Sequence, residues 1–321
     1  MSSTFDLLNA TRRNKDNEEY KLFDTNVEAD REPVLLNISR TLDLFRKSMS
    51  EKVGDRENGI ENRQASGASK SVDLWFESAI NRMTAIRVDG KDRDTPPMCF
   101  LPNLEQKKRN GVMRAVRRDG IMILVPELLD DSKSENASKG YTSAKHTLVH
   151  EFIHIMSCSE NRNSDGKIEY EIGLNFHGKK QFYDDLTEGL TEYYTRQMLN
   201  RMYPGQKIDE SRYPARMILI DKIMSKLDES EKNKMFELFV TGRSHEIADS
   251  IFSNLKTPRG LSLLELFDKA DSKGVRIGDQ DKKGDFKVAA KLSQMLDKFE
   301  MKNLPGKAVK TTSVECEQMG M

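Results

Sequence analysis

Cysteine is scarce in this chain of 321 residues, and the three that occur are Cys99, Cys158 and Cys316. Their number is odd and none of them forms a C-x-x-C pair, so the sequence argues against a disulfide framework or a cysteine metal clamp. We therefore expect synthesis in a reducing compartment.

The chain also has no formal net charge at pH 7, because 52 lysine and arginine residues balance 52 aspartate and glutamate residues. No net field draws the chain to nucleic acid or to an anionic membrane, and neither partner is predicted. No stretch approaches the ~20 apolar residues of a membrane span, and the start lacks a basic region followed by an apolar run. We expect a soluble protein, either cytoplasmic or exported without a standard signal peptide.

Histidine is nearly as rare, yet three of the five histidines fall within nine residues: His146, His150 and His154. The segment reads His-Thr-Leu-Val-His-Glu-Phe-Ile-His-Ile-Met-Ser, and its apolar residues cover most of a helix surface, so it predicts a buried helix. Residues at i and i+4 project from one helix face, which lets His150 and His154 bind a single metal ion. Glu151 stands beside that ion, where it can accept a proton from water.

Two neighbours of this motif receive other interpretations. His146 lies about 12 Å along the helix axis from His154, at ~1.5 Å per residue, and cannot share one ion with both other histidines. We interpret it as a surface residue of the first turn. Cys158 follows His154 by one helical turn, and we interpret it as a small residue at the helix end.

A third ligand is expected downstream, since catalytic zinc usually takes three protein ligands and leaves a fourth position to water. Glu188 and Glu192 are again spaced i and i+4 in a predicted helix. We assign Glu188 as the metal ligand and Glu192 as the acceptor of an N–H from a ligating histidine. The alternative is that both are ordinary solvated helix charges.

The combination of His150-Glu-x-x-His154 with Glu188-x-x-x-Glu192 resembles the gluzincin group of zinc metallopeptidases. The segment Thr187 to Thr195 is also similar to uncharacterised bacterial proteins of gluzincin type. The resemblance covers roughly residues 110 to 240, and the 33 residues between His154 and Glu188 exceed the connection of thermolysin-like members. It implies Zn²⁺ as the cofactor and a peptide or protein as the substrate. It also implies an α+β, zincin-like fold, with a small twisted sheet and an active-site helix followed by a mainly helical C-terminal half.

The same resemblance implies peptide hydrolysis, in which Glu151 deprotonates a zinc-activated water and returns the proton to the leaving amine. A second donor to the oxyanion, commonly Tyr or His in this group, is then expected. Tyr213, at the start of the helix after the Glu188 helix, is the first candidate, and Tyr183 and His245 are alternatives. Each of the three can instead be purely structural.

The remaining pattern divides the chain into three parts. Residues 1–70 read as a loose polar arm, an amphipathic helix through Leu35 to Met49, and a linker over 51–70. Residues 71–255 form the metallopeptidase domain, which begins with a second amphipathic helix whose Trp75 we place in the core. Residues 256–321 form a helical extension, with helices near 261–270 and 285–300, and a polar tail.

Strands are expected mainly before the histidine helix. Val112 to Val125 predicts a hairpin with an Asp119-Gly120 turn, and by similarity to gluzincins Ile121 to Val125 is a candidate sheet edge for an extended peptide. A plain core strand is the alternative. Residues 161–166 read as a loop, and apolar residues alternate with others from Ile168 to Phe176, which predicts a half-buried strand.

Two other functions stay open from the sequence. The chain could be a zinc-holding binding module of zincin fold, although binding alone has no use for Glu151. It could also be a leaderless effector protease with a single protein substrate, which keeps the chemistry and changes the biology. Cleavage specificity, endo- or exopeptidase action and oligomeric state do not follow from the sequence.

Overall fold

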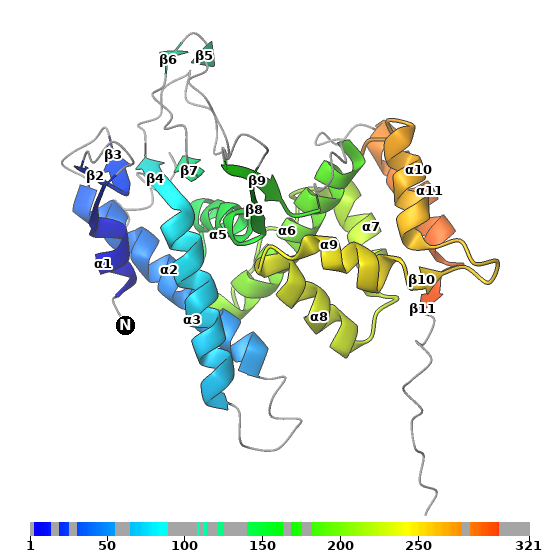
Figure 1. The fold of residues 1–321 in the computed structure, drawn as a ribbon, viewed down its shortest axis with the longest axis horizontal. Coiled ribbons are helices and arrows are strands. Elements are labelled where there is room, and N and C mark those ends of the chain that lie inside the picture. Colours follow the sequence, from blue (N-terminus) through cyan, green and yellow to red (C-terminus); the bar gives the residue numbers. More distant parts are fainter. Residues whose placement is uncertain are drawn as a thin grey trace, which may run out of the picture.

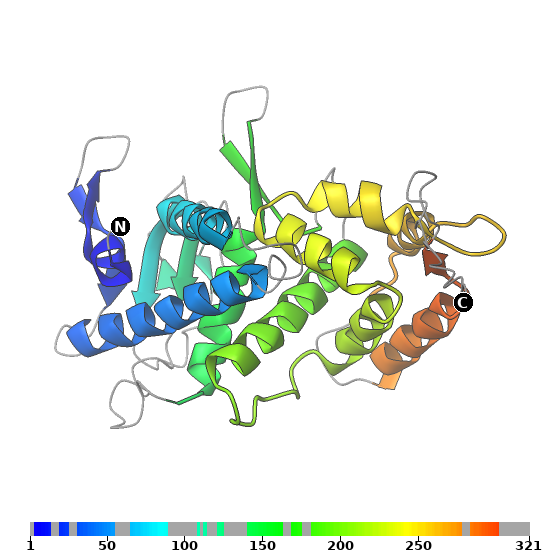
Figure 2. The ribbon, with the colours of Figure 1, turned by 90° about the horizontal axis from the view of Figure 1, so that it is seen from below.

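The structure is a computed structural model of the chain, shown in Figure 1, and it describes residues 3–13, 19–25, 31–54, 65–88, 108–109, 112–113, 121–124, 140–162, 168–174, 181–277 and 283–301. Over this part the protein is mainly helical, with small sheets of two or three strands. Figures 1 and 2 place helices α1 (Thr4–Asn9), α2 (Arg31–Gly54) and α3 (Ala65–Arg82) at one end of the molecule. Helices α10 (Leu263–Ser272) and α11 (Lys283–Leu296) lie at the other end.

Helix α5 (Ser143–Met156), which carries the histidine motif, lies at the centre of the core. Every residue of it after Ser143 is buried. Phe152 packs against Phe45 of α2 and Phe76 of α3, with ring centroids 5.6 and 5.2 Å apart. The amphipathic stripes predicted for α2 and α3 therefore pack on the body of the protein. Trp75, which we placed in the core, is only partly buried at its border.

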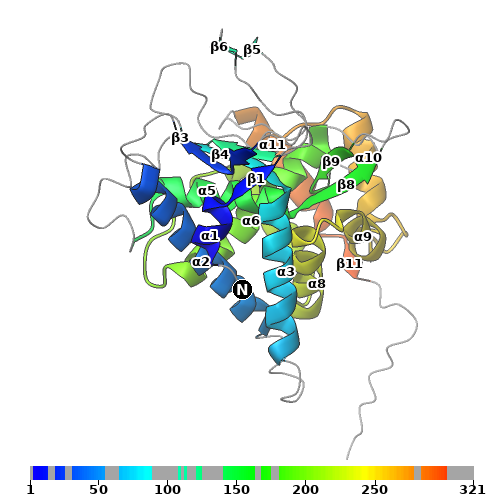
Figure 3. The same ribbon diagram turned by 60° about the vertical axis from the view of Figure 1, so that its left-hand side comes forward.

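A three-stranded parallel sheet lies next to α5, in the order β3-β4-β7. It is formed by β3 (Phe23–Thr25), β4 (Met83–Val88) and β7 (Ile121–Leu124), and β3 and β4 lie above α5 in the view of Figure 3. Among the described strands β7 pairs with β4 alone, which makes β7 an edge strand of this sheet, one of the two alternatives left open by the sequence.

The other strands form antiparallel pairs. They are β1 (Thr11–Arg13) with β2 (Glu19–Lys21), β5 (Lys108–Arg109) with β6 (Val112–Met113), β8 (Cys158–Arg162) with β9 (Ile168–Ile172), and β10 (Leu255–Lys256) with β11 (Glu300–Met301). The strand predicted from Ile168 is thus present as β9, although it ends at Ile172, before Gly173 adopts a positive φ.

The second half of the described chain is helical, as the sequence predicts. Helix α6 (Gln181–Met202) is followed by α7 (Pro214–Met224), α8 (Glu229–Val240), α9 (Ser244–Ile247) and the π-helical turn η2 (Ala248–Phe252). Helices α5 and α6 contact each other, and α6 also contacts α2, α7 and α10. None of the helices in the described ranges is long and apolar enough to cross a membrane.

Four local predictions are wrong. Residues 1 to about 32 were expected to form a loose arm, but their described part contains α1 and three short strands, and Leu8, Leu22 and Phe23 are fully buried. The linker expected over 51–70 overlaps two helices, because α2 continues to Gly54 and α3 begins at Ala65. The hairpin over Val112 to Val125 does not form, because β6 pairs with β5 and β7 pairs in parallel with β4. Its Asp119-Gly120 turn lies outside the described residues. Asn161 and Arg162, expected in a loop, belong to β8.

Candidate metal centre

Helix α5 is defined at both ends by polar side chains. The Thr142 hydroxyl accepts a hydrogen bond from the Lys145 backbone N–H at 3.3 Å, which caps the helix N-terminus. At the other end the Ser157 hydroxyl and the Cys158 thiol donate to the carbonyl of His154, at 2.9 and 3.3 Å. Cys158 is buried and uses its thiol at the helix end, as expected of a small residue there.

Helix α6 brings the glutamates to α5, and Gly189 sets how closely α7 approaches it. A Cβ atom on Gly189 would lie 2.7 Å from Cγ1 of Ile220 on α7. Only glycine fits at this distance, so the residue directly after Glu188 is selected by helix packing.

His150, His154 and Glu188 come together as the sequence predicts. Each offers one ligand atom, and these atoms all lie within 4.8 Å of one another. The two Nε2 atoms are 3.1 Å apart, and each lies 3.4 Å from an oxygen of Glu188. Ligand atoms bound ~2.1 Å from a tetrahedral ion lie about 3.4 Å from each other, so the spacing fits a metal ion.

The outer nitrogens of the two histidines have their own partners. Nδ1 of His150 donates to Oε2 of Glu192 at 3.2 Å, and Nδ1 of His154 lies 3.3 Å from the hydroxyl of Thr191. With a metal bound, Nδ1 would carry the hydrogen and each Nε2 lone pair would face the ion beside Glu188. Two imidazole lone pairs and a carboxylate directed at one point favour a positive charge there. Two histidines with one carboxylate are a donor set that zinc takes in catalytic sites.

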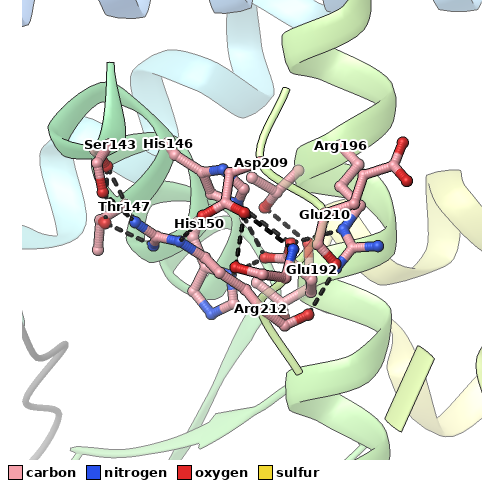
Figure 4. Close-up of polar contacts among 12 residues, drawn as sticks. Ser143, His146, Thr147, His150, Glu192, Arg196, Asp209, Glu210 and Arg212 are labelled. Atoms are coloured by element: carbon pink, nitrogen blue, oxygen red, sulfur yellow. Dashed lines mark hydrogen bonds and ion pairs between the residues drawn. The ribbon is translucent and has the colours of Figure 1, made fainter. Parts of the chain in front are cut away.

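Glu192 lies fully buried behind these ligands and accepts hydrogen bonds from three side chains (Figure 4). His146 donates from Nε2 at 3.0 Å, His150 from Nδ1 at 3.2 Å, and Arg196 from Nε at 2.7 Å. A buried carboxylate requires such charge-assisted donors, because it has lost its hydration. The position expected for Glu192, beside a histidine of the pair, is therefore the observed one.

His146 corrects the sequence interpretation, because it is fully buried and not a surface residue. Its Nδ1 accepts from the Tyr141 hydroxyl at 2.9 Å, and that hydroxyl accepts from the Asp209 N–H at 3.0 Å. His146 is not part of the metal-capable group. Its contribution is to hold Glu192, and the spacing of four residues before His150 was the signal that could have revealed it.

Two arginines tie the connection between α6 and α7 to this site. Arg196 donates from Nη2 to the carbonyls of Glu210 and Arg212, at 2.9 and 2.5 Å. Arg212 in turn donates to the hydroxyls of Thr147 and Ser143 on α5, each at 2.7 Å, as Figure 4 shows. Neither arginine was predicted from the sequence, because charges of both signs are spread along the chain and a partly buried arginine has no distinct pattern among them.

Tyr213 ends this connection and lies against a histidine of the metal-capable group. Its ring stacks on the ring of His150, with centroids 5.4 Å apart and an angle of 15° between the planes. The other two candidates for an oxyanion donor lie elsewhere. Tyr183 is buried and donates its hydroxyl to Asp268 at 2.7 Å, and His245 is an exposed residue of α9.

The pKa values follow from this arrangement. Burial lowers the pKa of His150, but hydrogen bonds to Glu188 and Glu192 outweigh it and raise the pKa to about 10. Burial raises the pKa of Glu192, but hydrogen bonds from His146 and His150 lower it to about 2. Burial lowers the pKa of His146 and outweighs the opposing effect of its hydrogen bond to Glu192. The carboxylates thus favour positive charge at the point where a metal would bind.

No protein-family model, curated protein or solved structure matches the chain. We therefore infer the function of the protein from the residues of the site alone.

Proposed function

We propose that the protein is a zinc-dependent peptidase of gluzincin type, with His150, His154 and Glu188 as the zinc ligands. The supporting observation is the group of two Nε2 atoms and one carboxylate, which is spaced for a single ion. Its two histidines lie on α5, the helix that also carries Glu151, and its carboxylate comes from α6. The side chain of Glu188 is 32% exposed, whereas both histidines are buried. Solvent and a substrate can therefore reach a bound ion from the side of Glu188. The zincin-like fold belongs to the same proposal.

Zinc at this site would polarise the scissile carbonyl and lower the pKa of a water molecule to about 7. Glu151 accepts a proton from the water that attacks the carbonyl carbon. When the C–N bond breaks, Glu151 donates that proton to the leaving amine, so the reaction consumes one water and yields a carboxylate and an amine. Glu192 keeps His150 in the tautomer that directs Nε2 inward.

Tyr213 supplies the second donor in this proposal. Its ring lies on that of His150, which brings its side chain to the metal-capable group. A hydroxyl donor next to the developing oxyanion stabilises the transition state more than the ground state, because the charge is larger there. The hydroxyl is therefore the group whose loss should lower kcat.

The substrate in this proposal is a peptide or an unfolded protein segment. Strand β7 is an edge strand among the described strands and contacts α5. An extended peptide can pair with such an edge through backbone hydrogen bonds, which depend on its shape and little on its sequence. This would place a peptide bond close to the helix that carries Glu151.

The test is cleavage profiling of a diverse peptide library by mass spectrometry, with the zinc-loaded protein and Glu151→Gln as the blank. New peptides that appear with the unmodified protein alone would establish a peptidase and give its specificity. If zinc binds but no peptide of the library is cleaved, the peptidase proposal fails and a zinc-holding binding module takes its place.

A further inference from the structure

The backbone of Tyr213 has a conformation that tyrosine rarely adopts. Its φ of 52° and ψ of 42° lie in the left-handed region, and among the described residues it is the one non-glycine with a positive φ. This conformation costs an L-residue about 1–2 kcal/mol, whereas glycine adopts it freely. A tyrosine persists in such a position only where its surroundings hold it.

Arg216 is one of the groups that hold it. Its guanidinium carbon lies 5.0 Å from the centroid of the Tyr213 ring, within the range of a cation–π contact. The same ring stacks on His150. Arg216 lies three residues after Tyr213, in the first turn of α7, where the Tyr213 carbonyl accepts from the Met217 N–H at 2.9 Å.

Asp185 fixes the guanidinium in turn. Its Oδ1 accepts from Nε of Arg216 at 3.2 Å and from Nη2 at 2.7 Å, and both side chains are almost fully buried. Its Oδ2 accepts the backbone N–H of Ile277 at 2.7 Å. Asp185 lies one helical turn before Glu188 on α6. A continuous series of contacts therefore runs from Ile277 through Asp185 and Arg216 to Tyr213 and His150.

We propose that Arg216, held by Asp185, is a positioning residue that keeps Tyr213 against His150 in the proposed peptidase, on which this inference rests. The backbone N–H of Ile277 orients Asp185, so the C-terminal segment after residue 255 also helps to position Tyr213. The planar guanidinium is what the arrangement needs, since it accommodates the carboxylate and the aromatic ring together. A lysine at 216 keeps the charge, but its ammonium group has neither the flat face that lies over the ring nor the two donors that contact the carboxylate.

The experiment compares Arg216→Lys with Arg243→Lys, a matched exchange in an exposed pair with Glu246 on α9. Hydrogen exchange by mass spectrometry on the full chain follows one peptide over residues 205–217 and another over Glu229–Val240. The positioning role predicts faster exchange for 205–217 in Arg216→Lys alone, with 229–240 unchanged. Equal acceleration of both peptides, or of neither, contradicts it.

Activity supplies a second readout in a double-mutant cycle. With Tyr213 present, Arg216→Lys should lower kcat about 10- to 100-fold with KM unchanged. In a Tyr213→Phe background the same exchange should change kcat less than about 2-fold, because the hydroxyl to be positioned is gone. Independent, multiplying losses would overturn the proposal.

The two proposals can fail separately. If the unmodified protein cleaves no peptide, the peptidase proposal fails, and hydrogen exchange alone decides whether Arg216 holds Tyr213. If Tyr213→Phe keeps full kcat, the donor role of Tyr213 fails, and Arg216 then positions no catalytic group.

Discussion

His146 donates its Nε2 hydrogen to Glu192 at 3.0 Å, which joins a residue one turn before His150 to a residue one turn after Glu188. Helices α5 and α6 are antiparallel at the site, since His150 and His154 both contact Glu188 while His146 contacts Glu192. Moving one turn toward the N-terminus of α5 therefore corresponds to moving one turn toward the C-terminus of α6. The metal-capable group and the contact between His146 and Glu192 thus belong to the same interface between the two helices.

Loss of the carboxylate behind His150 should weaken metal binding without removing a ligand. Glu192→Gln keeps the shape of the side chain but loses the charge that His146, His150 and Arg196 share. Partners of this kind typically change metal affinity about 10- to 100-fold, and we expect a loss in that range. Competition titration with a zinc indicator measures it. Glu210→Gln, an exposed residue, is the control, and an equal loss in both variants would contradict the role of Glu192.

Glu151 should be needed for hydrolysis and dispensable for the metal. In Glu151→Gln the amide can neither accept the proton of water nor return it, so kcat should fall to background, while His150, His154 and Glu188 remain. Zinc content by elemental analysis and peptide cleavage are measured on the same preparation. Retained cleavage at more than a few per cent would exclude Glu151 as the general base.

Gly189 should be intolerant of a methyl group. Gly189→Ala would force α6 and α7 apart at Ile220, and overpacking of this kind costs about 1–3 kcal/mol of unfolding free energy. Because Glu188 is the adjacent residue, zinc affinity should fall as well. Chemical denaturation and zinc titration test both effects. Gly284→Ala, where a Cβ meets nothing within 4 Å, should leave both values unchanged or raise stability slightly.

Zinc should stabilise the folded protein, because the ligands from α5 and α6 are assembled only in that state. At a free zinc concentration of 100 times Kd the free energy of unfolding should rise by about 2.7 kcal/mol. Thermal denaturation with and without a chelator shows the difference as a change in Tm. In His150→Ala the Tm should no longer respond to zinc, and a response as large as in the unmodified protein would exclude His150 as a ligand.

The sequence was sufficient to predict the site residues that lie one helical turn apart on the same helix. The i and i+4 pairs in α5 and α6 follow from helix periodicity and were predicted. His146 was misplaced because its burial depends on α6, which is distant in sequence. The pairing of β7 with β4, and not with β6, likewise depends on contacts between residues distant in sequence. The hairpin was predicted because an Asp-Gly pair favours a local turn by its intrinsic propensity.

The positive φ of Tyr213 was also beyond sequence reasoning. Nothing in Ser-Arg-Tyr-Pro indicates a left-handed residue, because the conformation is maintained by contacts with Arg216 and His150 that only the fold creates. The same holds for the buried ion pair between Asp185 and Arg216. Buried ion pairs of this kind are set by tertiary packing and leave no periodic signal.

The most direct test of the account is the zinc affinity of Glu188→Ala, measured beside Asp184→Ala on the same helix. Asp184 is exposed and lies outside the metal-capable group, so it controls for loss of an acidic residue near the site. We expect that Glu188→Ala loses stoichiometric zinc binding, while Asp184→Ala keeps the affinity of the unmodified protein. Unchanged zinc affinity in Glu188→Ala would contradict the proposed ligand set and, with it, the gluzincin assignment.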